Sequence, residues 1–350
     1  MAEVLIIRLS AIGDVAMTVP VIYSAAGANP ADTFTVLTQT FLHPLFTHRP
    51  TNVKMIGINT KGAEKTPGGF LRFAVALVGC RRYDVILDLH CVIRSRIIDG
   101  MFRLKGKPVF ILNKMRKAQR RLTRKPPKDI RPLPAVTERY AEVFFAAGIH
   151  FDKTFSSLYD AHPLNMTVTE NPVGEKTGRW VGIAPFARHR GKTYPPAQME
   201  KVVETLSRQE GITVFLFGAR GAEEATLGQW ESRYGHTRNV AGRYSLDQEL
   251  VLIHQLDVLL CMDSANMHFA SLVGTRAVSI WGATHPYAGF YGYGQPYQSA
   301  IQTDLPCRPC SIFGNKPCYR GDWACMTQIT PDTITGKIYE YLKFKDSKIQ

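Results

Sequence analysis

Polar residues that could hold a phosphate group follow an apolar segment late in the sequence. In "VLLCMDSANMH", residues 258–268, Asp263 and Ser264 follow the apolar run, and a helical pattern begins at Ala265. The unpaired N–H groups of a helix's first turn form a site for an anion such as pyrophosphate. His268 lies one turn into this helix, where it could reach the same anion. The simpler interpretation is that Asp263 and Ser264 only cap the helix and that His268 is a surface residue.

A basic segment follows another apolar run. In "FARHRGKTYPP", residues 186–196, Arg188 and Lys192 come directly after "WVGIAP" and before a helix that the two prolines begin. Cations at the end of a strand would bind phosphates and offset the charge on a departing diphosphate. A solvated basic loop without a ligand is the alternative.

Two adjacent glutamates follow a third strand-like run. In "LFGARGAEE", residues 216–224, the glycines allow a tight exit from the strand, and Glu223 and Glu224 follow them. Either carboxylate could accept hydrogen bonds from ribose hydroxyls, as acidic residues do in dinucleotide-binding folds. Either could equally be a first-turn glutamate that favours the helix dipole. The sequence leaves both residues and both roles open.

A carboxylate stands at an unexpected place near the N-terminus. In "IIRLSAIGDVAMTVPVI", residues 6–22, a buried strand is followed by Gly13 and then Asp14. A loop that binds phosphate through backbone N–H groups should avoid a negative charge, so this loop has another task. Capping of the first helix is the ordinary role for such an aspartate. Pro20 lies beyond the first turn of that helix and predicts a kink near Ala16.

These segments require strands that alternate with helices. Such alternation predicts an α/β protein with parallel sheets and helices on their faces. The expected strands of the first half are "EVLIIRL", "TFTVLTQ", "NVKMIGI", "YDVILDL" and "PVFIL", and those of the second half are "WVGIAP", "TVFLFG", "DVLLCM" and "AVSIWG". The second half thus repeats the architecture of the first, and two such lobes would face a cleft.

The length of the chain agrees with two domains. Its 350 residues exceed the roughly 100 to 200 that are usual for one domain. We expect an N-terminal domain over residues 1–164, a polar linker over 165–178, a C-terminal domain over 179–328 and a final helix over 329–350. Thr330 and Pro331 are typical of the N-cap and first position of that last helix.

The composition is that of a soluble globular protein with a strong positive charge. Apolar residues make up 45% of the chain, and the formal net charge is +14. No stretch reaches the ~18 apolar residues of a membrane-spanning helix, and the N-terminal apolar run lacks the features of a secretory leader. We therefore expect a cytoplasmic protein. The charge indicates an anionic partner, which could be nucleic acid, a membrane surface or a phosphorylated small molecule.

Much of the positive charge is concentrated in one segment. Residues 113–131 contain nine Lys or Arg, Arg120 and Arg121 among them, and one Asp. The segment has no aromatic residue, so it lacks the stacking platform of single-stranded nucleic-acid binders. We interpret it as a mobile loop of the N-terminal lobe that contacts an anionic glycolipid and the inner-leaflet surface. A solvated basic loop without a specific ligand is the alternative.

Four cysteines lie close together near the C-terminus. Cys307, Cys310, Cys318 and Cys325 form the pattern C-x2-C-x7-C-x6-C. In a cytosolic protein such a cluster indicates a metal site more than disulfides, so structural zinc is one interpretation and free thiols are the other. We assign these cysteines no catalytic role.

Taken together, the segments resemble glycosyltransferase family nine, the bacterial heptosyltransferases. The resemblance rests on "VLIIRLSAIGDVAMTVPVI", "GKTYPP", "AGRYSL" at 241–246 and "DSANMHFASLVGTRAVSIWGATHP". It implies a GT-B fold of two Rossmann-like lobes that face a central cleft, with the C-terminal helix packing back toward the N-terminal lobe. It also implies inverting, metal-independent transfer from a nucleotide sugar, typically ADP-heptose, to the inner core of lipopolysaccharide.

The resemblance also assigns roles to individual residues. Asp14 falls on the proposed general base, Lys192 on a lysine that contacts the donor phosphate, and Asp263, Ser264 and His268 on a motif that binds the diphosphate. The remaining candidates for the donor site are Arg188, Glu223, Glu224 and Ala265, and those for the acceptor site are Ser10, Gly13, His90, Arg94, Arg120 and Arg121. This sequence has Ala265 where the family has glycine and Tyr194 where tryptophan is usual.

We therefore expect a heptosyltransferase-like enzyme that needs no cofactor for catalysis and binds no specific nucleic acid. It would work in the cytoplasm, peripherally on the inner membrane. One alternative is a GT-B enzyme that acts on a different nucleotide sugar, such as an epimerase. The other is a non-catalytic protein that binds RNA or another anionic ligand.

Overall fold

The chain folds into two compact units. The computed structural model describes residues 1–80, 82–126, 128, 130–160 and 173–346. Unit 1 comprises Met1–Met115 and Pro134–Leu158, and unit 2 comprises Arg116–Leu133 and Tyr159–Gln350. The division near residue 158 is close to the expected end of the N-terminal domain at residue 164. Most of the expected linker, residues 165–172, lies outside the described residues.

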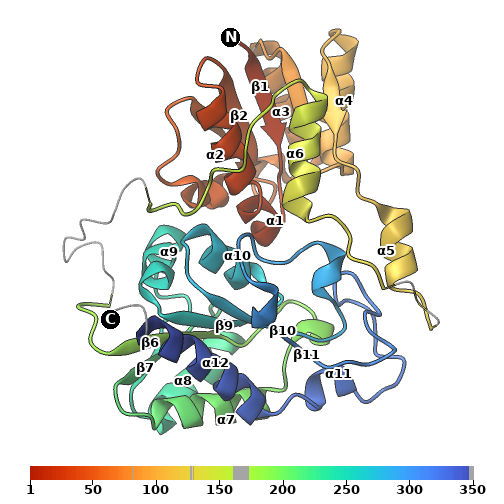
Figure 1. Ribbon diagram of the computed structural model, residues 1–350. Helices are drawn as coiled ribbons and strands as arrows, with labels where there is room; N and C mark the ends of the chain where they lie inside the picture. The colour runs from red at the N-terminus through yellow and green to blue at the C-terminus, as the bar shows by residue number, and fades with distance from the viewer. Residues whose placement is uncertain (81, 127, 129, 161–172, 347–350) are drawn as a thin grey trace. The chain divides into compact units, whose positions relative to one another are not determined.

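Unit 1 is built on a five-stranded parallel sheet with the order β3-β2-β1-β4-β5 (Figure 1). Its strands are β1 (Glu3–Ile7), β2 (Thr33–Gln39), β3 (Val53–Ile58), β4 (Val85–Asp88) and β5 (Val109–Ile111). The central strands are runs of Val, Ile and Leu because both faces of a parallel sheet are covered. Each of these strands coincides with a run that the sequence predicts.

Helices cover the sheet of unit 1. They are α1 (Ile12–Ala16), α2 (Val19–Ala28), α3 (Pro67–Cys80), α4 (Ile93–Leu104) and α6 (Val136–Ala146), with short 3₁₀ turns η1 (Thr40–Phe46) and η2 (Ala63–Lys65). The buried sides of α3 and α4 share one apolar core with strands β1 and β4. The break between α1 and α2 confirms the kink expected near Ala16, and Pro20 lies in the first turn of α2.

Unit 2 is built on a six-stranded parallel sheet with the order β11-β10-β9-β6-β7-β8. Its strands are β6 (Arg179–Ala184), β7 (Ile212–Leu216), β8 (Thr237–Asn239), β9 (Val258–Met262), β10 (Ala277–Trp281) and β11 (Ala300–Gln302). Its helices are α5 (Arg116–Leu122), α7 (Pro196–Ser207), α8 (Ala222–Arg233), α9 (Leu246–Gln255), α10 (Ala265–Leu272), α11 (Ala324–Thr327) and α12 (Pro331–Asp346), and its 3₁₀ turns are η3 (Arg190–Lys192), η4 (Pro286–Ala288) and η5 (Tyr297–Ser299).

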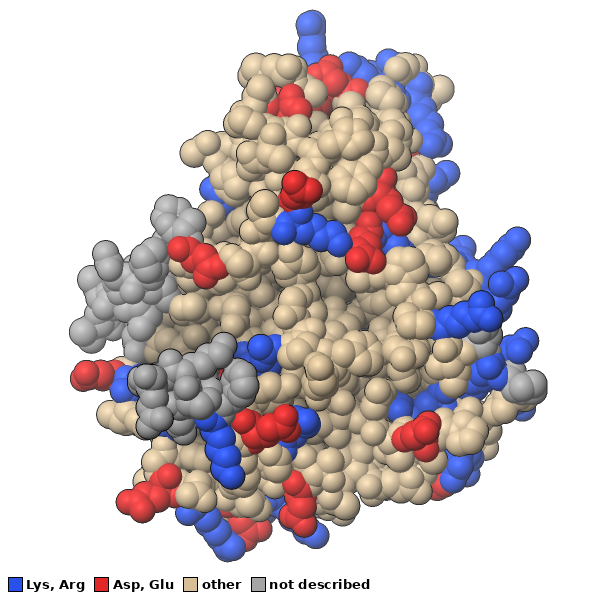
Figure 2. All heavy atoms as spheres, in the orientation of Figure 1, with Lys and Arg blue, Asp and Glu red and all other residues tan. Residues whose placement is uncertain are grey.

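The basic segment does not belong to the unit for which it was predicted. Residues 116–133 are part of unit 2, and a helix, α5, forms where the sequence suggested a loop. The Lys128 ammonium donates to the carbonyl oxygens of Cys307 and Pro309, which attaches the segment to the cysteine-rich region. Lys and Arg side chains gather at the edge of unit 2 where α5 lies (Figure 2).

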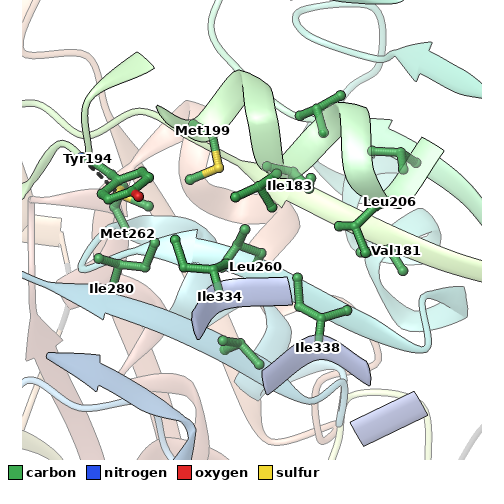
Figure 3. Close-up of a cluster of buried hydrophobic side chains, with 14 of the residues drawn as sticks. Val181, Ile183, Tyr194, Met199, Leu206, Leu260, Met262, Ile280, Ile334 and Ile338 are labelled. Atoms are coloured by element: carbon green, nitrogen blue, oxygen red, sulfur yellow. Dashed lines mark hydrogen bonds between the residues drawn. The ribbon is translucent and has the colours of Figure 1, made fainter. Parts of the chain in front are cut away.

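The C-terminal helix completes the core of unit 2. Ile334, Ile338 and Leu342 of α12 are buried in one cluster with residues of β6, β9, β10 and α7 (Figure 3). We expected this helix to pack back toward the N-terminal lobe. The apolar side of α12 lies in the core of unit 2, and packing toward the N-terminal lobe stays a prediction. Thr330 caps the helix as predicted, since its hydroxyl accepts the N–H of Thr333.

Each sheet has one place where the strand order reverses. In unit 1 the chain runs outward in both directions from the adjacent pair β1 and β4, and in unit 2 from the adjacent pair β6 and β9. Open α/β sheets bind ligands at the carboxyl ends of the strands at such a switch point. In the part of the chain that the structure describes, no helix is both long and apolar enough to cross a membrane.

Candidate functional site

Lys192 and Asp263 form an ion pair at the switch point of unit 2. Lys192 follows β6 in η3, Asp263 follows β9, and the ammonium Nζ lies 2.8 Å from Oδ2 of the carboxylate. Only 18% of the Lys192 side chain and 5% of the Asp263 side chain are exposed. The pair therefore sits in a largely dry setting, where charges interact more strongly than at the surface. The structure thus brings together two residues that are 71 positions apart in the sequence.

Tight backbone packing fixes the position of Lys192. A Cβ atom on Gly191 would lie 2.7 Å from the carbonyl oxygen of Gly314, so only glycine fits there. The backbone carbonyl of Gly191 also accepts the N–H of Ala283. The aliphatic stem of Lys192 packs over Gly314, where an added Cβ would meet the lysine Cγ at 2.6 Å. These contacts hold the ammonium at the end of β6.

The N-terminus of α10 is available for an anion. Ser264 occupies the N-cap position in an extended conformation, but its hydroxyl makes no cap hydrogen bond. The hydroxyl oxygen is buried and has no hydrogen-bond partner among the described residues. Ala265 begins the helix, and His268 is buried one turn further on. The sequence identified Ser264 as a good N-cap, whereas the structure leaves its hydroxyl to another partner.

Glu223 and Glu224 both cap the start of α8. Glu223 accepts the N–H of Ala219 at 2.8 Å, and Glu224 accepts the N–H of Gly221 at 3.3 Å. These bonds agree with the simpler of the two interpretations of the sequence. The residues follow β7, which neighbours β6, so they lie at the same sheet edge as Lys192. Arg188 is exposed in the loop between β6 and η3.

Asp14 is bound to a buried arginine at the switch point of unit 1. One oxygen, Oδ2, lies 2.6 Å from the Arg8 guanidinium and also accepts the N–H of Ala11 at 3.3 Å. Arg8 follows β1, and a second nitrogen of its guanidinium, Nη1, donates to the carbonyl oxygen of Leu89 at 2.6 Å. Arg8 was not predicted from the sequence, although a lone arginine directly after a buried strand is a signal that could have found it.

The geometry leaves part of the Asp14 carboxylate open. The helix N-cap is Ala11, and Asp14 stands at the third helical position, so capping is a partial role. Both contacts made within the described residues use Oδ2. The side chain is 27% exposed. Oδ1 is therefore placed to accept a proton or a hydrogen bond from a ligand.

His90 and Ser10 lie beside this pair. His90 follows β4, and its Nδ1 accepts the N–H of Leu9 at 3.3 Å while its Nε2 lies 3.3 Å from the Ser10 hydroxyl. Burial, together with the positive charge of Arg8, lowers the pKa of His90 to about 3. The ring is neutral at physiological pH, and because Nδ1 accepts, the proton is on Nε2 and points to Ser10.

A buried carboxyl pair supports the loop that carries His90. Asp88 accepts the N–H groups of His90 and Cys91 and the hydroxyl of Ser95, each at 2.8 Å. Asp99 on α4 is fully buried, and its burial and the adjacent Asp88 raise its pKa to about 8. Asp99 therefore keeps its proton near neutral pH and donates a hydrogen bond to Asp88. No pattern in the sequence pointed to this pair, because an aspartate inside a helix is ordinarily exposed.

The other acceptor-site candidates lie in different surroundings. Gly13 is in α1 next to Asp14. The Arg94 guanidinium donates to the carbonyl oxygen of Lys65 and lies over the Phe70 ring. Arg120 and Arg121 are exposed on α5, in unit 2. The described contacts thus join Ser10 to His90 and Asp14 to Arg8, and they do not include Arg94, Arg120 or Arg121.

The four clustered cysteines line one small cavity. Its volume is about 10 Å³, and Arg308 and Trp323 also line it. Among the described residues, no three His, Cys, Asp or Glu side chains form a group that could hold a metal ion. The side chains as placed do not fit structural zinc, which stays a prediction of the sequence. Zinc analysis of the purified protein and of Cys310→Ser tests it, and four reactive thiols without zinc would refute it.

Comparison with known proteins agrees with this architecture. The family model for glycosyltransferase family 9 (heptosyltransferase) matches residues 71–315. The glycosyl transferase family 9 structure from Veillonella parvula is 16% identical with a TM-score of 0.72 and covers 97% of each chain. E. coli heptosyltransferase WaaC with ADP is 17% identical with a TM-score of 0.69 over 97% of this chain and 99% of that one. E. coli ADP-heptose lps heptosyltransferase II is 19% identical with a TM-score of 0.67 over 98% and 99%.

A search by sequence among curated proteins gave no match. The structural likeness extends over nearly the whole chain and confirms the GT-B class that the sequence predicted. The family model spans half of unit 1 and most of unit 2, including the segments that carry Lys192 and Asp263. The chain therefore belongs to glycosyltransferase family 9, the heptosyltransferase family.

Proposed function

We propose that the protein transfers a heptose from ADP-heptose to a lipopolysaccharide core or a related anionic glycolipid. The observation that carries the proposal is the Lys192–Asp263 pair beside the open N-terminus of α10, at the switch point of unit 2. The similar structures include a heptosyltransferase with ADP and an ADP-heptose heptosyltransferase, which supports this choice of donor.

In this proposal Lys192 and α10 hold the donor diphosphate. An ammonium has three N–H donors, so Lys192 can keep Asp263 and still bind a phosphate oxygen. Asp263 then orients the lysine. Lys192 in turn shields the negative charge of Asp263 from the diphosphate. The Ser264 hydroxyl and the first N–H groups of α10, from Ala265 on, bind a second phosphate oxygen. His268 lies in the next turn.

Arg188, Glu223 and Glu224 complete the donor-site proposal. Arg188 is exposed and free to reach a phosphate, whereas each glutamate must bind ribose with an oxygen that it does not use to cap α8. Replacing each with glutamine and measuring the ADP affinity identifies the one that binds ribose.

Asp14 is the proposed general base. Its open Oδ1 accepts the proton of the attacking acceptor hydroxyl, and attack from the face opposite the diphosphate inverts the anomeric centre. Arg8 holds the other oxygen, so the carboxylate has one orientation. Ser10, Gly13 and His90 surround the base on the acceptor side, and Arg94, Arg120 and Arg121 are proposed contacts for the anionic parts of the acceptor.

We propose that catalysis requires no metal ion. The leaving diphosphate gains positive charge from Lys192 and from the N–H groups of α10. Transfer should then continue at full rate in the presence of EDTA. A loss of activity that Mg²⁺ restores would contradict this part of the proposal.

The donor site can be tested by calorimetry. The wild-type protein is titrated with ADP, UDP, GDP and ADP-heptose, and the titrations are repeated with Lys192→Met and with the matched control Lys201→Met on α7, an exposed lysine of the same unit. We expect selective binding of ADP and its sugar that is lost in Lys192→Met and kept in the control. Because the variant leaves Asp263 without its partner, Lys192→Met with Asp263→Asn is the second variant.

The outcomes separate the alternatives. Preference for another nucleotide would keep the family and discard ADP-heptose. Absence of nucleotide binding, together with salt-dependent retention of RNA, would instead favour a non-catalytic binder. Transfer to lipopolysaccharide lacking heptose, detected by mass spectrometry, would establish the acceptor class.

A further inference from the structure

The outer side of α3 and α4 in unit 1 carries large apolar side chains that no other element of the described part of the chain covers. Leu71 and Val75 of α3 are 52% and 55% exposed, and Ile93, Ile97 and Leu104 of α4 are 82%, 40% and 91% exposed. Soluble proteins expose single apolar side chains commonly, but a contiguous group marks an interaction site. We call this surface, together with Arg72, Arg96 and Arg103, the α3–α4 face.

Helix geometry places these residues on one surface. Leu71 and Val75 are four positions apart, as are Ile93 and Ile97, so each pair lies on one side of its helix. The opposite sides of both helices are buried in one core that includes Phe70, Leu77, Ile98 and Phe102. Because α3 and α4 pack against each other over the same sheet face, their outer sides form one continuous surface.

The charges on this face have one sign. Arg72, Arg96 and Arg103 are exposed on the same two helices. The sequence of α3 contains no Asp or Glu, and the one acidic residue of α4, Asp99, is fully buried. Figure 2 shows Lys and Arg side chains along the edge of unit 1 where α4 lies. The surface therefore combines apolar side chains with arginines at their margins.

We propose that the α3–α4 face binds the surface of an anionic lipid bilayer. Helices that lie in a membrane interface bury an apolar side among the acyl chains, and their Arg and Lys residues contact anionic headgroups. A second copy of this chain is a poor occupant, because it would set arginine against arginine. A nucleic acid is disfavoured as well, since the face has no aromatic side chain on which bases could stack.

This proposal differs from the prediction made for residues 113–131. Helix α5 is basic, but its large apolar residue, Leu122, is buried, so it offers charge without an apolar surface to insert. The α3–α4 face has both. Binding to vesicles needs neither donor nor acceptor, so its failure and the failure of the proposed activity are separate results.

The test is binding of the full chain to lipid vesicles, measured by co-sedimentation. Vesicles of phosphatidylglycerol with phosphatidylethanolamine are compared with vesicles of phosphatidylcholine alone. We expect binding to the anionic vesicles only, and a loss of roughly tenfold or more in Ile93→Asp with Ile97→Asp, because charged residues resist insertion. Arg72→Glu with Arg103→Glu should weaken binding through the headgroup charge.

Matched controls exclude general effects of the substitutions. Phe145→Asp changes an apolar residue of α6 that is as exposed as Ile97, at 40% for both, and should bind vesicles normally. Lys54→Glu on β3 reverses a charge elsewhere in unit 1 and should have little effect. The substituted residues are exposed, so folding is expected to persist, and circular dichroism checks this.

Three results would overturn the proposal. The first is absence of wild-type binding to anionic vesicles. The second is vesicle binding by the double variant Ile93→Asp, Ile97→Asp that equals the wild type. A loss of vesicle binding only in the double variant Arg120→Glu, Arg121→Glu on α5 would count in the same way. The third is a dimer in analytical ultracentrifugation that Ile97→Asp dissociates, which would assign the face to a second copy of the chain.

Discussion

Asp14 has to be held in place and still remain able to take a proton. Arg8 meets the first need, since it binds Oδ2 at 2.6 Å and is itself anchored to the carbonyl oxygen of Leu89. The open Oδ1 meets the second. An arrangement that used both oxygens for structure would leave no site for the acceptor's proton. One oxygen of the Asp14 carboxylate thus serves the structure, and the other remains for the proposed catalytic role.

Replacement of Asp14 should affect chemistry and not donor binding. Asp14→Asn keeps the shape of the side chain and removes the base, so we expect transfer to fall by about 10² to 10⁴-fold. ADP affinity should be unchanged, because the proposed donor contacts are all in unit 2. The measurement is the initial rate with ADP-heptose beside a calorimetric titration with ADP. Asp152→Asn, an exposed aspartate of unit 1, is the control, and nearly wild-type transfer by Asp14→Asn would reject the base.

The Asp88–Asp99 pair predicts a dependence of stability on pH. Asp99 has a pKa of about 8 when folded, and an unfolded aspartate has a pKa near 3.9. Between these values the folded state keeps a proton that the unfolded state has released, so stability falls as pH rises from about 4 to about 8 and then levels. Asp99→Asn cannot ionise, and its amide can still donate to Asp88.

Thermal unfolding measured across this pH range tests the pair. We expect Asp99→Asn to melt close to wild type near the acid end and at a higher temperature near pH 8. Asp152→Asn should follow the wild-type curve throughout. Parallel curves for wild type and Asp99→Asn would show that Asp99 does not retain its proton in the folded protein.

At the scale of elements, the start of α10 differs from an ordinary capped helix. A serine N-cap replaced by alanine usually costs about 1 kcal/mol of stability. Ser264 makes no cap hydrogen bond, so Ser264→Ala should cost much less, while ADP affinity falls. Thr330→Ala in α12 is the matched comparison, because Thr330 does cap its helix and should lose about 1 kcal/mol. Chemical denaturation and calorimetry give the two quantities.

A different pattern of results would remove Ser264 from the donor site. If Ser264→Ala lost as much stability as Thr330→Ala and kept its ADP affinity, the hydroxyl would serve the helix alone.

The main elements were predictable because their signals are local. Runs such as "VLLCM" and "AVSIW" are apolar enough to be buried strands wherever they lie, and they became β9 and β10. The short strands β8 and β11 were not predicted, since "TRN" and "AIQ" contain at most two apolar residues each and only neighbouring strands define them. Thr330 and Pro331 gave the start of α12, but its packing partner depended on the tertiary core.

The candidate site was predictable only in its parts. Asp14, Lys192 and Asp263 were found from their positions after strand-like runs. The pairs Arg8–Asp14 and Lys192–Asp263 were not, because an ion pair depends on how distant segments meet. The same holds for Lys128, whose partners are the carbonyl oxygens of Cys307 and Pro309. Nothing in residues 113–131 indicated that they belong to unit 2.

At the scale of the whole molecule, Lys128 should hold the 116–133 segment against unit 2. Lys128→Met removes two hydrogen bonds that a charged group donates. Such a hydrogen bond contributes about 1.5 to 3 kcal/mol to stability. We expect faster amide hydrogen exchange in residues 116–126 and little change in unit 1. Lys117→Met on α5 is the control. Unchanged exchange in Lys128→Met would mean that other contacts, such as Lys125 over the Tyr319 ring, hold the segment.

The division of the chain also has a consequence for its synthesis on the ribosome. The segment 116–133 emerges before unit 1 is complete, yet Lys128 is separated from Cys307 and Pro309 by 179 and 181 positions. Unit 1 can fold once residues 134–158 have left the exit tunnel. Residues 116–133 then form a loop that has not yet met its partners in unit 2. At the ~5 to 20 residues per second of translation, roughly ten seconds or more pass before Cys307 and Pro309 are synthesised. For that interval the nascent protein carries a strongly basic loop exposed to every polyanion in its surroundings.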